Sequence, residues 1–375
     1  MTGASRGSHL PTLDGWRGVA ILLVICCHVR WPWESAQSVA PYGALGVHVF
    51  FALSGFLITA RLLDEYQRVG RVSWADFYIR RIFRILPPAL VCLAVLALLG
   101  FGLHSIPFDR RQLTASLFFY RNYTILPADL GWYTGHFWSL AVEEHFYLLW
   151  PLLLGIFGIR RGMTVAAASA AVVVLWRGLD EHFGWVAAAH PLLRGEPGRT
   201  DYRLDGLFWG CVAAYAWANP RARAVIARWS GSLAVLAVAA LIVAFLVWTP
   251  PGYVAVLAIL MALLPLASLG RPTSWIGRLL ESRPLAWIGH VSYSLYLWQQ
   301  LFLPHATVPM LLPRIQVLPF NVALAFLVAW LSYVFVEQPA MRVGKILQQR
   351  RLARPASGRP VWASGEGMQE RHAGP

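Results

Sequence analysis

The sequence predicts an all-α integral membrane protein with about ten transmembrane helices. Of its 375 residues, 57% are hydrophobic and only 13% are charged, whereas a soluble domain has about 25% charged residues. The apolar residues come in blocks of about twenty, the length that an α-helix needs to cross a hydrocarbon core of about 30 Å. These two observations favour a polytopic membrane protein over a soluble fold.

Ten apolar blocks follow one another along the chain. We expect them at residues 17–33, 44–63, 86–103, 137–157, 163–179, 202–219, 232–249, 252–270, 286–303 and 317–337. The blocks near 137 and 286 are rich in polar side chains, which in a span usually face the bundle interior and mark function. The first block lacks a small-residue cleavage site, so we interpret it as a retained span and not as a signal peptide.

The distribution of basic residues tests this count. Ten spans place both termini on one side. If that side is the cytoplasm, it holds 23 of the 32 Lys and Arg residues and the opposite side holds nine. Cytoplasmic loops of membrane proteins carry such an excess. We therefore expect a multi-pass protein of the bacterial inner (plasma) membrane, and we interpret the net charge of +14 as an orientation signal and not as a nucleic-acid site.

The chain divides into two parts. Residues 1–345 are expected to form one transmembrane domain. Residues 346–375 are rich in Arg, Gly, Pro and Ser, so we expect a basic tail that is disordered or lies on anionic headgroups. The four Cys residues lie in apolar stretches without zinc-ligand spacing, and no metal site is predicted.

The first polar pair lies on the first span. Eleven residues separate Arg17 from His28, which places both within about 20° of one helix face and about 16 Å apart. A cation near the cytoplasmic surface and a deeper imidazole match a donor with an anionic head and a long neutral arm, such as coenzyme A. A His can also take the proton of an attacking hydroxyl. The alternative is a hydrogen-bonded His and an Arg that anchors the helix end, and the pair alone is a weak signal.

The second block combines a buried imidazole with small residues. Ser54 and Gly55 allow close helix packing, which is the role we expect for Ser54. His48 lies deep within the block and needs a polar partner.

Three Arg residues precede the third block. Arg80, Arg81 and Arg84 come just before Pro87, which we expect to open the next helix. Guanidinium groups bind phosphates in a bidentate manner, so this cluster is a candidate grip for a nucleotide phosphate. The alternative is a plain anchor for lipid headgroups.

The fourth block contains adjacent carboxylates, Glu143 and Glu144, between two His residues. Buried charges are costly and therefore indicate function. One carboxylate is expected to orient the imidazole of His28 or to stabilise its protonated form. Because neighbouring residues on a helix point about 100° apart, we expect only one of the two to face the site. Arg203 with Asp205, and Glu337, are either internal ion pairs or helix ends.

Taken in order, these segments resemble the membrane-bound acyltransferase 3 family. The matching segments are Leu13-Asp14-Gly15 with Arg17 and His28, Phe50-Phe51 to Ile58, Arg80 to Arg84, Trp138-Ser139-Leu140 with Glu143-Glu144, Arg203 with Asp205, Ser292 to Trp298, and Glu337. The resemblance runs from about residue 10 to 342. It implies an enzyme that takes an acetyl or related acyl group from acyl-CoA. Its acceptors are hydroxyls of surface polysaccharides, peptidoglycan, lipid-linked sugars or secondary metabolites.

The resemblance also implies roles for individual residues. The catalytic residues are expected to be His28, Glu143 and Glu144, and the residues that bind acyl-CoA are expected to be Arg17, Arg80, Arg81 and Arg84. Acceptor contacts are expected from Asp14, His48, His145, Arg203, Asp205 and Tyr293. The expected partners are acyl-CoA as donor, the carbohydrate or metabolite acceptor and the lipid bilayer, without a permanently bound cofactor. A transporter of a lipid-linked glycan and a non-catalytic membrane scaffold are the alternatives.

Overall fold

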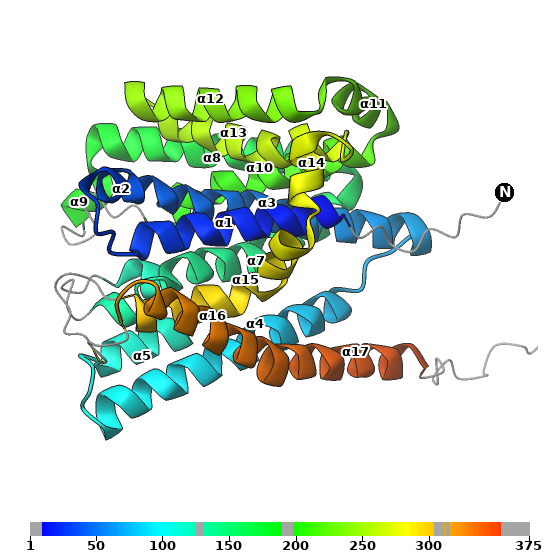
Figure 1. Cartoon of the computed structure of the whole chain (residues 1–375). Coiled ribbons are helices and arrows are strands. Elements are labelled where there is room, and N and C mark those ends of the chain that lie inside the picture. The colour runs from blue at the N-terminus through cyan, green and yellow to red at the C-terminus, as the bar shows by residue number, and fades with distance from the viewer. Residues whose placement is uncertain (1–9, 125–130, 190–197, 304–310, 312–315, 354–375) are drawn as a thin grey trace, which may run out of the picture.

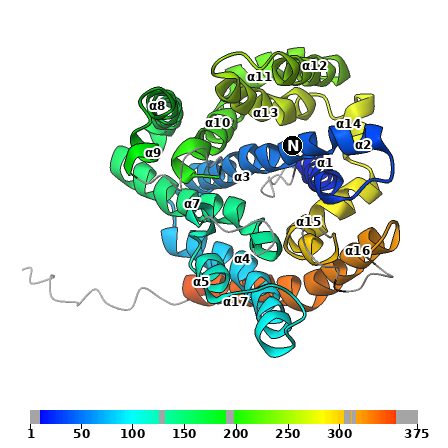
Figure 2. The ribbon, with the colours of Figure 1, turned by 90° about the vertical axis from the view of Figure 1, so that its left-hand side faces the viewer.

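The computed structural model describes residues 10–124, 131–189, 198–303, 311 and 316–353. This part of the chain forms helices, turns and connecting segments and contains no strand, which confirms the all-α class for the described residues. Most of the long helices run along one common direction, and α1 begins on the side where α17 ends (Figure 1). The view along this direction shows α3 near the middle, surrounded by the other helices (Figure 2).

Each of the ten predicted apolar blocks coincides with a helix. These helices are α1 (Pro11–His28), α3 (Leu45–Val69), α4 (Trp74–Ala97), α7 (Phe137–Phe157), α8 (Gly162–Phe183), α10 (Thr200–Ala218), α12 (Ser232–Trp248), α13 (Tyr253–Leu269), α15 (Arg283–Phe302) and α16 (Phe320–Ser332). Further helices join or extend them: α2 (Glu34–Val39), α5 (Arg110–Leu117), α9 (Trp185–Ala189), α11 (Pro220–Trp229), α14 (Trp275–Leu280) and α17 (Gln338–Ala353).

Fewer than ten of these helices are long and apolar enough to be recognised as membrane spans by length and composition alone. Five stretches in the described part qualify: Tyr42–Val69, Trp74–Gly102, Trp132–Phe157, Ile159–Phe183 and Phe320–Arg351. Helices α11 and α12 make a sixth if they are counted as one span, although they meet at 85°. Helices α1, α10 and α15 do not qualify, and they carry many of the buried polar side chains of the bundle.

One predicted helix start is wrong. Helix α4 begins at Trp74, where the Ser73 hydroxyl caps it by accepting from the Asp76 backbone N–H at 3.3 Å. Pro87 therefore lies inside α4 and does not open it, so the arginines before it belong to the same helix as the apolar block. At the other end, α17 continues to Ala353, so the expected domain boundary at 345 falls within a helix. Residues 354–375 lie outside the described part.

The centre of the bundle is a close crossing of α3 and α10. A Cβ atom added to Gly55 would lie 1.9 Å from the carbonyl oxygen of Leu207, and one added to Gly210 would lie 2.1 Å from that of Ala52. The two backbones are thus in direct contact, as small residues permit in membrane helices. Helix α3 also packs on α1 and α13. This crossing fixes α3, whose other face carries part of the candidate site.

We predict opposite effects for two Gly-to-Ala substitutions. Gly210→Ala forces the α3 backbone away and should destabilise the fold by about 1–3 kcal/mol, the usual cost of overpacking. Gly155→Ala is the control because a Cβ there meets nothing within 4 Å, and Ala favours a helix over Gly by about 1 kcal/mol. The midpoint of thermal unfolding in detergent should fall for the first variant and stay or rise for the second. Equal midpoints would contradict the crossing.

Candidate active site

A cavity of about 840 Å³ opens between helices α1, α3, α4, α7, α10 and α15. Its rim carries the exposed side chains of Arg68, near the end of α3, and of Arg223 on α11, on the side where α1 begins. Its deepest lining residues include Ser139 and Tyr296, in the first turn of α7 and the last part of α15. The cavity therefore reaches from one end of the bundle far toward the other.

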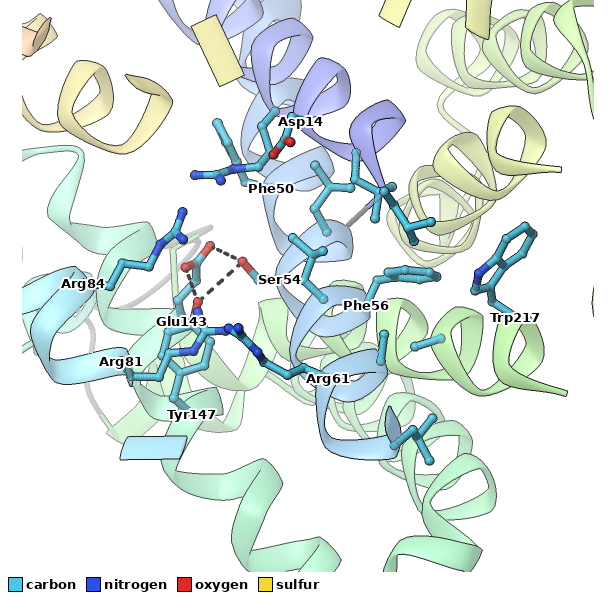
Figure 3. A pocket seen from close by; sticks show the side chains of 18 of the residues that line it. Asp14, Phe50, Ser54, Phe56, Arg61, Arg81, Arg84, Glu143, Tyr147 and Trp217 are labelled. Carbon is cyan, nitrogen blue, oxygen red and sulfur yellow. Dashed lines mark hydrogen bonds between the residues drawn. The ribbon is translucent and has the colours of Figure 1, made fainter. Parts of the chain in front are cut away.

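A hydrogen-bonded group lies in the middle of this cavity. The Glu143 carboxylate accepts from the Ser54 hydroxyl at 3.1 Å and from the Tyr147 hydroxyl at 2.7 Å. We call these three residues the Glu143 cluster (Figure 3). The expected packing role of Ser54 is wrong. Gly55 makes the close helix contact, which leaves the Ser54 hydroxyl to bind α7 across the cavity.

Four guanidinium groups from three helices surround the Glu143 cluster. This arginine cluster consists of Arg17 on α1, Arg61 on α3, and Arg81 and Arg84 on α4. Figure 3 shows the labelled members Arg61, Arg81 and Arg84 beside the cluster. The guanidinium carbon of Arg81 lies 4.9 Å from the centre of the Tyr147 ring, a cation–π distance. Four cations converge on one cavity and favour an anionic ligand there.

Sequence reasoning missed Arg61 as a cavity residue. From the sequence, it is expected only to be one of the basic residues on the cytoplasmic side. A signal was present, because Arg61 follows Ser54 by seven residues and therefore lies within about 20° of it on the same helix face. Both residues line the cavity.

Both adjacent carboxylates line the cavity, so the expectation that only one would face it is wrong. Ser139, Glu143 and Tyr147 follow at intervals of four residues and share one face of α7. Glu144 lies beside that face, and the cavity is wide enough to include it. One of its carboxylate oxygens is buried without a hydrogen-bond partner among the described residues.

The predicted site residues fall into two groups, those that line the cavity and those that do not. Seven of the predicted residues line the cavity: Asp14, Arg17, Arg81, Arg84, Glu143, Glu144 and Tyr293. Arg80 does not line the cavity, and it pairs with Glu65 of α3 at 3.4 Å. The Tyr293 hydroxyl donates to the Ile85 carbonyl at 2.8 Å and so ties α15 to α4.

His28 lies at the opposite end of α1 from the basic rim and is not among the residues that line the cavity. Its Nδ1 donates to the Val24 carbonyl at 2.9 Å, because a carbonyl oxygen only accepts. In the neutral ring the basic nitrogen is therefore Nε2. The ring packs edge-on against Trp132, with the centroids 5.4 Å apart. A main-chain oxygen thus orients this imidazole, while Glu143 is bound within its own cluster.

Four predicted acceptor contacts belong to a second polar region, between α3, α7, α8 and α10. Asp205 forms a buried internal ion pair at 3.0 Å, but its partner is Arg177 of α8 and not Arg203. Arg203 lies 3.4 Å from Nε2 of His48. His145 hydrogen-bonds Thr200 at 2.7 Å. None of the four predicted residues lines the cavity.

The end of α8 is tied to the start of α10 by a related network. Arg199 pairs with Asp180 at 2.9 Å and with Asp201 at 2.5 Å. Burial alone would lower the pKa of Arg199, but its hydrogen bonds to the two carboxylates outweigh that effect and raise the pKa. The buried polar side chains of this second region therefore have hydrogen-bond partners within the protein, as expected for groups that stabilise the fold.

The Arg177–Asp205 pair gives a prediction for stability. Arg177→Met leaves the Asp205 carboxylate buried and unpaired, which should cost about 3–5 kcal/mol. The double variant Arg177→Met, Asp205→Leu removes both charges and should recover most of that loss. Thermal midpoints in detergent measure both. If the single variant melts like the wild type, the pair contributes nothing to stability.

A wall of hydrogen-bonded side chains closes the deep end of the cavity. The hydroxyls of Ser139 and Tyr296 are hydrogen-bonded to each other at 2.5 Å, with one of them as the donor. Both also lie within hydrogen-bond distance of the main-chain oxygen of His136, at 3.2 and 3.1 Å, and the hydroxyl that accepts from its neighbour donates to this oxygen. Gln300 binds the ring of His136 from α15. We call these four residues the deep wall. Sequence reasoning gave none of them a role, because the contacts join segments far apart in the chain.

Comparisons with known proteins identify the family of the chain. The profile of the acyltransferase domain matches residues 10–337. The chain is 29% identical over 372 residues to the peptidoglycan O-acetyltransferase OatA of Listeria monocytogenes, covering 90% of this chain and 57% of that protein. It is 29% identical over 365 residues to the O-acetyltransferase OatA of Staphylococcus aureus, covering 90% and 58%.

The chain thus spans less than three fifths of the length of these two relatives. No solved structure matches it. The family profile covers most of the sequence, including the arginine cluster, the Glu143 cluster and the deep wall. The chain belongs to the acyltransferase 3 family of membrane-bound acyltransferases.

Proposed function

We propose that the chain is an integral membrane O-acyltransferase of the bacterial inner membrane. It moves an acetyl or other short acyl group from acyl-CoA to a hydroxyl of a cell-surface glycan, a lipid-linked sugar or a secondary metabolite. Ten spans with both termini in the cytoplasm are part of this proposal. It is supported by the coincidence of all ten apolar blocks with helices, by the basic-residue bias, and by relatives that are named O-acetyltransferases.

The observation that carries the proposal is the arginine cluster inside the cavity. Acyl-CoA joins a phosphate-rich nucleotide to a long neutral arm that ends in the thioester. Guanidinium groups bind phosphates in a bidentate manner, and Coulomb attraction strengthens as water is excluded. A cavity whose outer part is basic and whose deep part is lined by hydroxyl and aromatic groups suits both parts of that donor.

The proposed reaction begins with donor binding from the cytoplasm. The phosphates are held by Arg81 and Arg84, joined by Arg17 and Arg61, and the arm extends toward the deep wall. The Glu143 carboxylate offsets part of the charge of the arginines, and its hydrogen bonds hold α3 against α7. His28 then acts on the thioester end, either by taking the proton of the acceptor hydroxyl or by carrying the acyl group itself.

Mass spectrometry of whole cells tests this proposal. A bacterial host that expresses the chain is compared with the same host carrying an empty vector, and its surface glycans, lipid-linked sugars and secreted metabolites are weighed. The expected result is an acyl mass increment on one of these classes in the expressing strain only. A larger amount of exported glycan of unchanged mass would indicate the transporter instead. Identical masses and identical amounts in the two strains would contradict both activities.

A further inference from the structure

The deep wall contains one buried imidazole nitrogen that the fold does not use. His136 is only 3% exposed. Its Nε2 has no hydrogen-bond partner among the described residues, although its Nδ1, its backbone N–H and its carbonyl oxygen are all bonded. An unpaired buried polar atom costs about 1–3 kcal/mol. Such an exception calls for a reason other than folding stability.

Gln300 fixes which nitrogen of His136 carries the proton. Its Oε1 accepts from the backbone N–H of His136 at 3.1 Å, so the amide must present its oxygen at this point. The same oxygen lies 2.5 Å from Nδ1, and only a protonated Nδ1 can donate to it. The Nε2 atom of the neutral ring therefore holds a lone pair, and it is a base.

His136 and His28 belong to one cluster at the same end of the bundle. The ring of Trp132 packs against His28, and its indole N–H donates to the main-chain oxygen of Gln300 at 2.9 Å. The two imidazoles also lie within electrostatic reach of each other. The ring of Tyr296, which lines the cavity, lies 5.5 Å from that of His136. Trp132 and Gln300 thus link the two differently held imidazoles, and Tyr296 links His136 to the cavity lining.

We propose that His136 is a second base of the reaction, which takes the proton of the acceptor hydroxyl at Nε2 while His28 carries the acyl group. This inference rests on the proposed acyltransferase function. It follows from the need for a second base: once the Nε2 of His28 is acylated, it has no lone pair left for the hydroxyl proton. The unpaired nitrogen of His136 supplies that lone pair.

The two half-reactions balance. In the first, Nε2 of His28 attacks the thioester carbonyl carbon, the C–S bond breaks and coenzyme A leaves as a thiolate. The Val24 carbonyl keeps the proton on Nδ1, so the product is a cationic acyl-imidazolium whose charge balances that of the thiolate. In the second, the hydroxyl oxygen attacks the acyl carbon, its proton passes to His136, and the C–N bond breaks to return neutral His28. His136 then releases the proton to solvent, and the thiolate takes up a proton from solvent.

The substitution His136→Asn removes the proposed base but keeps a hydrogen-bond donor that supports the fold. The side-chain nitrogen of Asn falls near the position of Nδ1, so it keeps a donor toward Gln300, but no atom replaces Nε2. His104→Asn is the matched control, because His104 is exposed and has a φ of 51°, a conformation that Asn tolerates. Thermal midpoints of both variants, measured first, report on folding.

The assay uses the full chain in nanodiscs with labelled acetyl-CoA and muramyl oligosaccharides from lysozyme-digested peptidoglycan. Quenched-flow samples give released coenzyme A and acetylated oligosaccharide. For His136→Asn we expect one rapid equivalent of coenzyme A per protein, as in the wild type, and transfer to the oligosaccharide reduced at least about 100-fold, the usual contribution of a positioned base.

Three other results are decisive. Transfer by His136→Asn at the wild-type rate overturns the second base. Loss of the rapid coenzyme A release in a variant that melts normally also overturns it, because His136 would then act before the acceptor. A wild type that neither releases coenzyme A nor acetylates the oligosaccharide overturns the acyl-His28 intermediate and the second base with it. An acyl mass increment in the whole-cell experiment would then still support the proposed function, and its absence there would contradict that function as well.

Discussion

Replacement of His28 by Ala is expected to reduce acyl transfer by a factor of about 10²–10⁴, the range that a positioned catalytic imidazole supplies. Both the rapid release of coenzyme A and the formation of the acylated product should disappear, since the first bond change occurs at this residue. The KM for acetyl-CoA should stay within about twofold, because His28 lies about 16 Å along α1 from Arg17, at the far end from the basic rim.

The control for this experiment is His182→Ala. His182 is exposed near the end of α8 and does not line the cavity, so the same change of side chain should leave transfer unaltered. Both variants are reconstituted in nanodiscs and assayed with labelled acetyl-CoA. Full activity of His28→Ala would show that His28 is not a catalytic residue and would contradict the proposed mechanism.

The second large effect concerns the donor's phosphates. Arg81→Gln and Arg84→Gln should each raise the KM for acetyl-CoA by about 10- to 100-fold. A hydrogen bond to a charged group is worth about 1.5–3 kcal/mol, and 1.4 kcal/mol is a factor of ten. Arg228→Gln is the control, because Arg228 is exposed on α11 and does not line the cavity.

A truncated donor sharpens this prediction. Acetyl-pantetheine has the thioester and the arm of acetyl-CoA but no nucleotide. Its KM should therefore be high in the wild type and the same in Arg81→Gln and Arg84→Gln. If the two substitutions raise the KM for acetyl-pantetheine as much as the KM for acetyl-CoA, the arginines affect the fold or the reaction and do not bind the phosphates.

Much of the fold could be predicted from local signals. An apolar run of about twenty residues forms a helix in a membrane whatever its neighbours are, and all ten runs coincide with helices. Arg81 and Arg84 are three residues apart and share a helix face, so their common exposure to the cavity could also be expected. The boundaries were less accurate, because the cap at Ser73 determines where α4 begins.

The site was predicted only in part, because side-chain partners depend on which helices meet. Ser54 has the same small side chain whether it packs against a helix or binds a carboxylate, and only the approach of α7 decides between these roles. His136 and Gln300 are 164 residues apart in sequence. No local pattern reveals that the amide of Gln300 fixes the tautomer of His136, or that Nε2 is left unpaired.

The central claim is that the nucleotide end of the donor occupies the cavity beside the arginine cluster. It can be tested in a chain whose four native Cys residues are replaced by Ser and that carries one new Cys. Ala60→Cys places a thiol in the cavity lining, and Val69→Cys places one on the same helix outside it, where the side chain is 61% exposed. We expect desulfo-coenzyme A to slow maleimide labelling at position 60 and to leave position 69 unchanged. Equal labelling rates at position 60 with and without this ligand would contradict the claim.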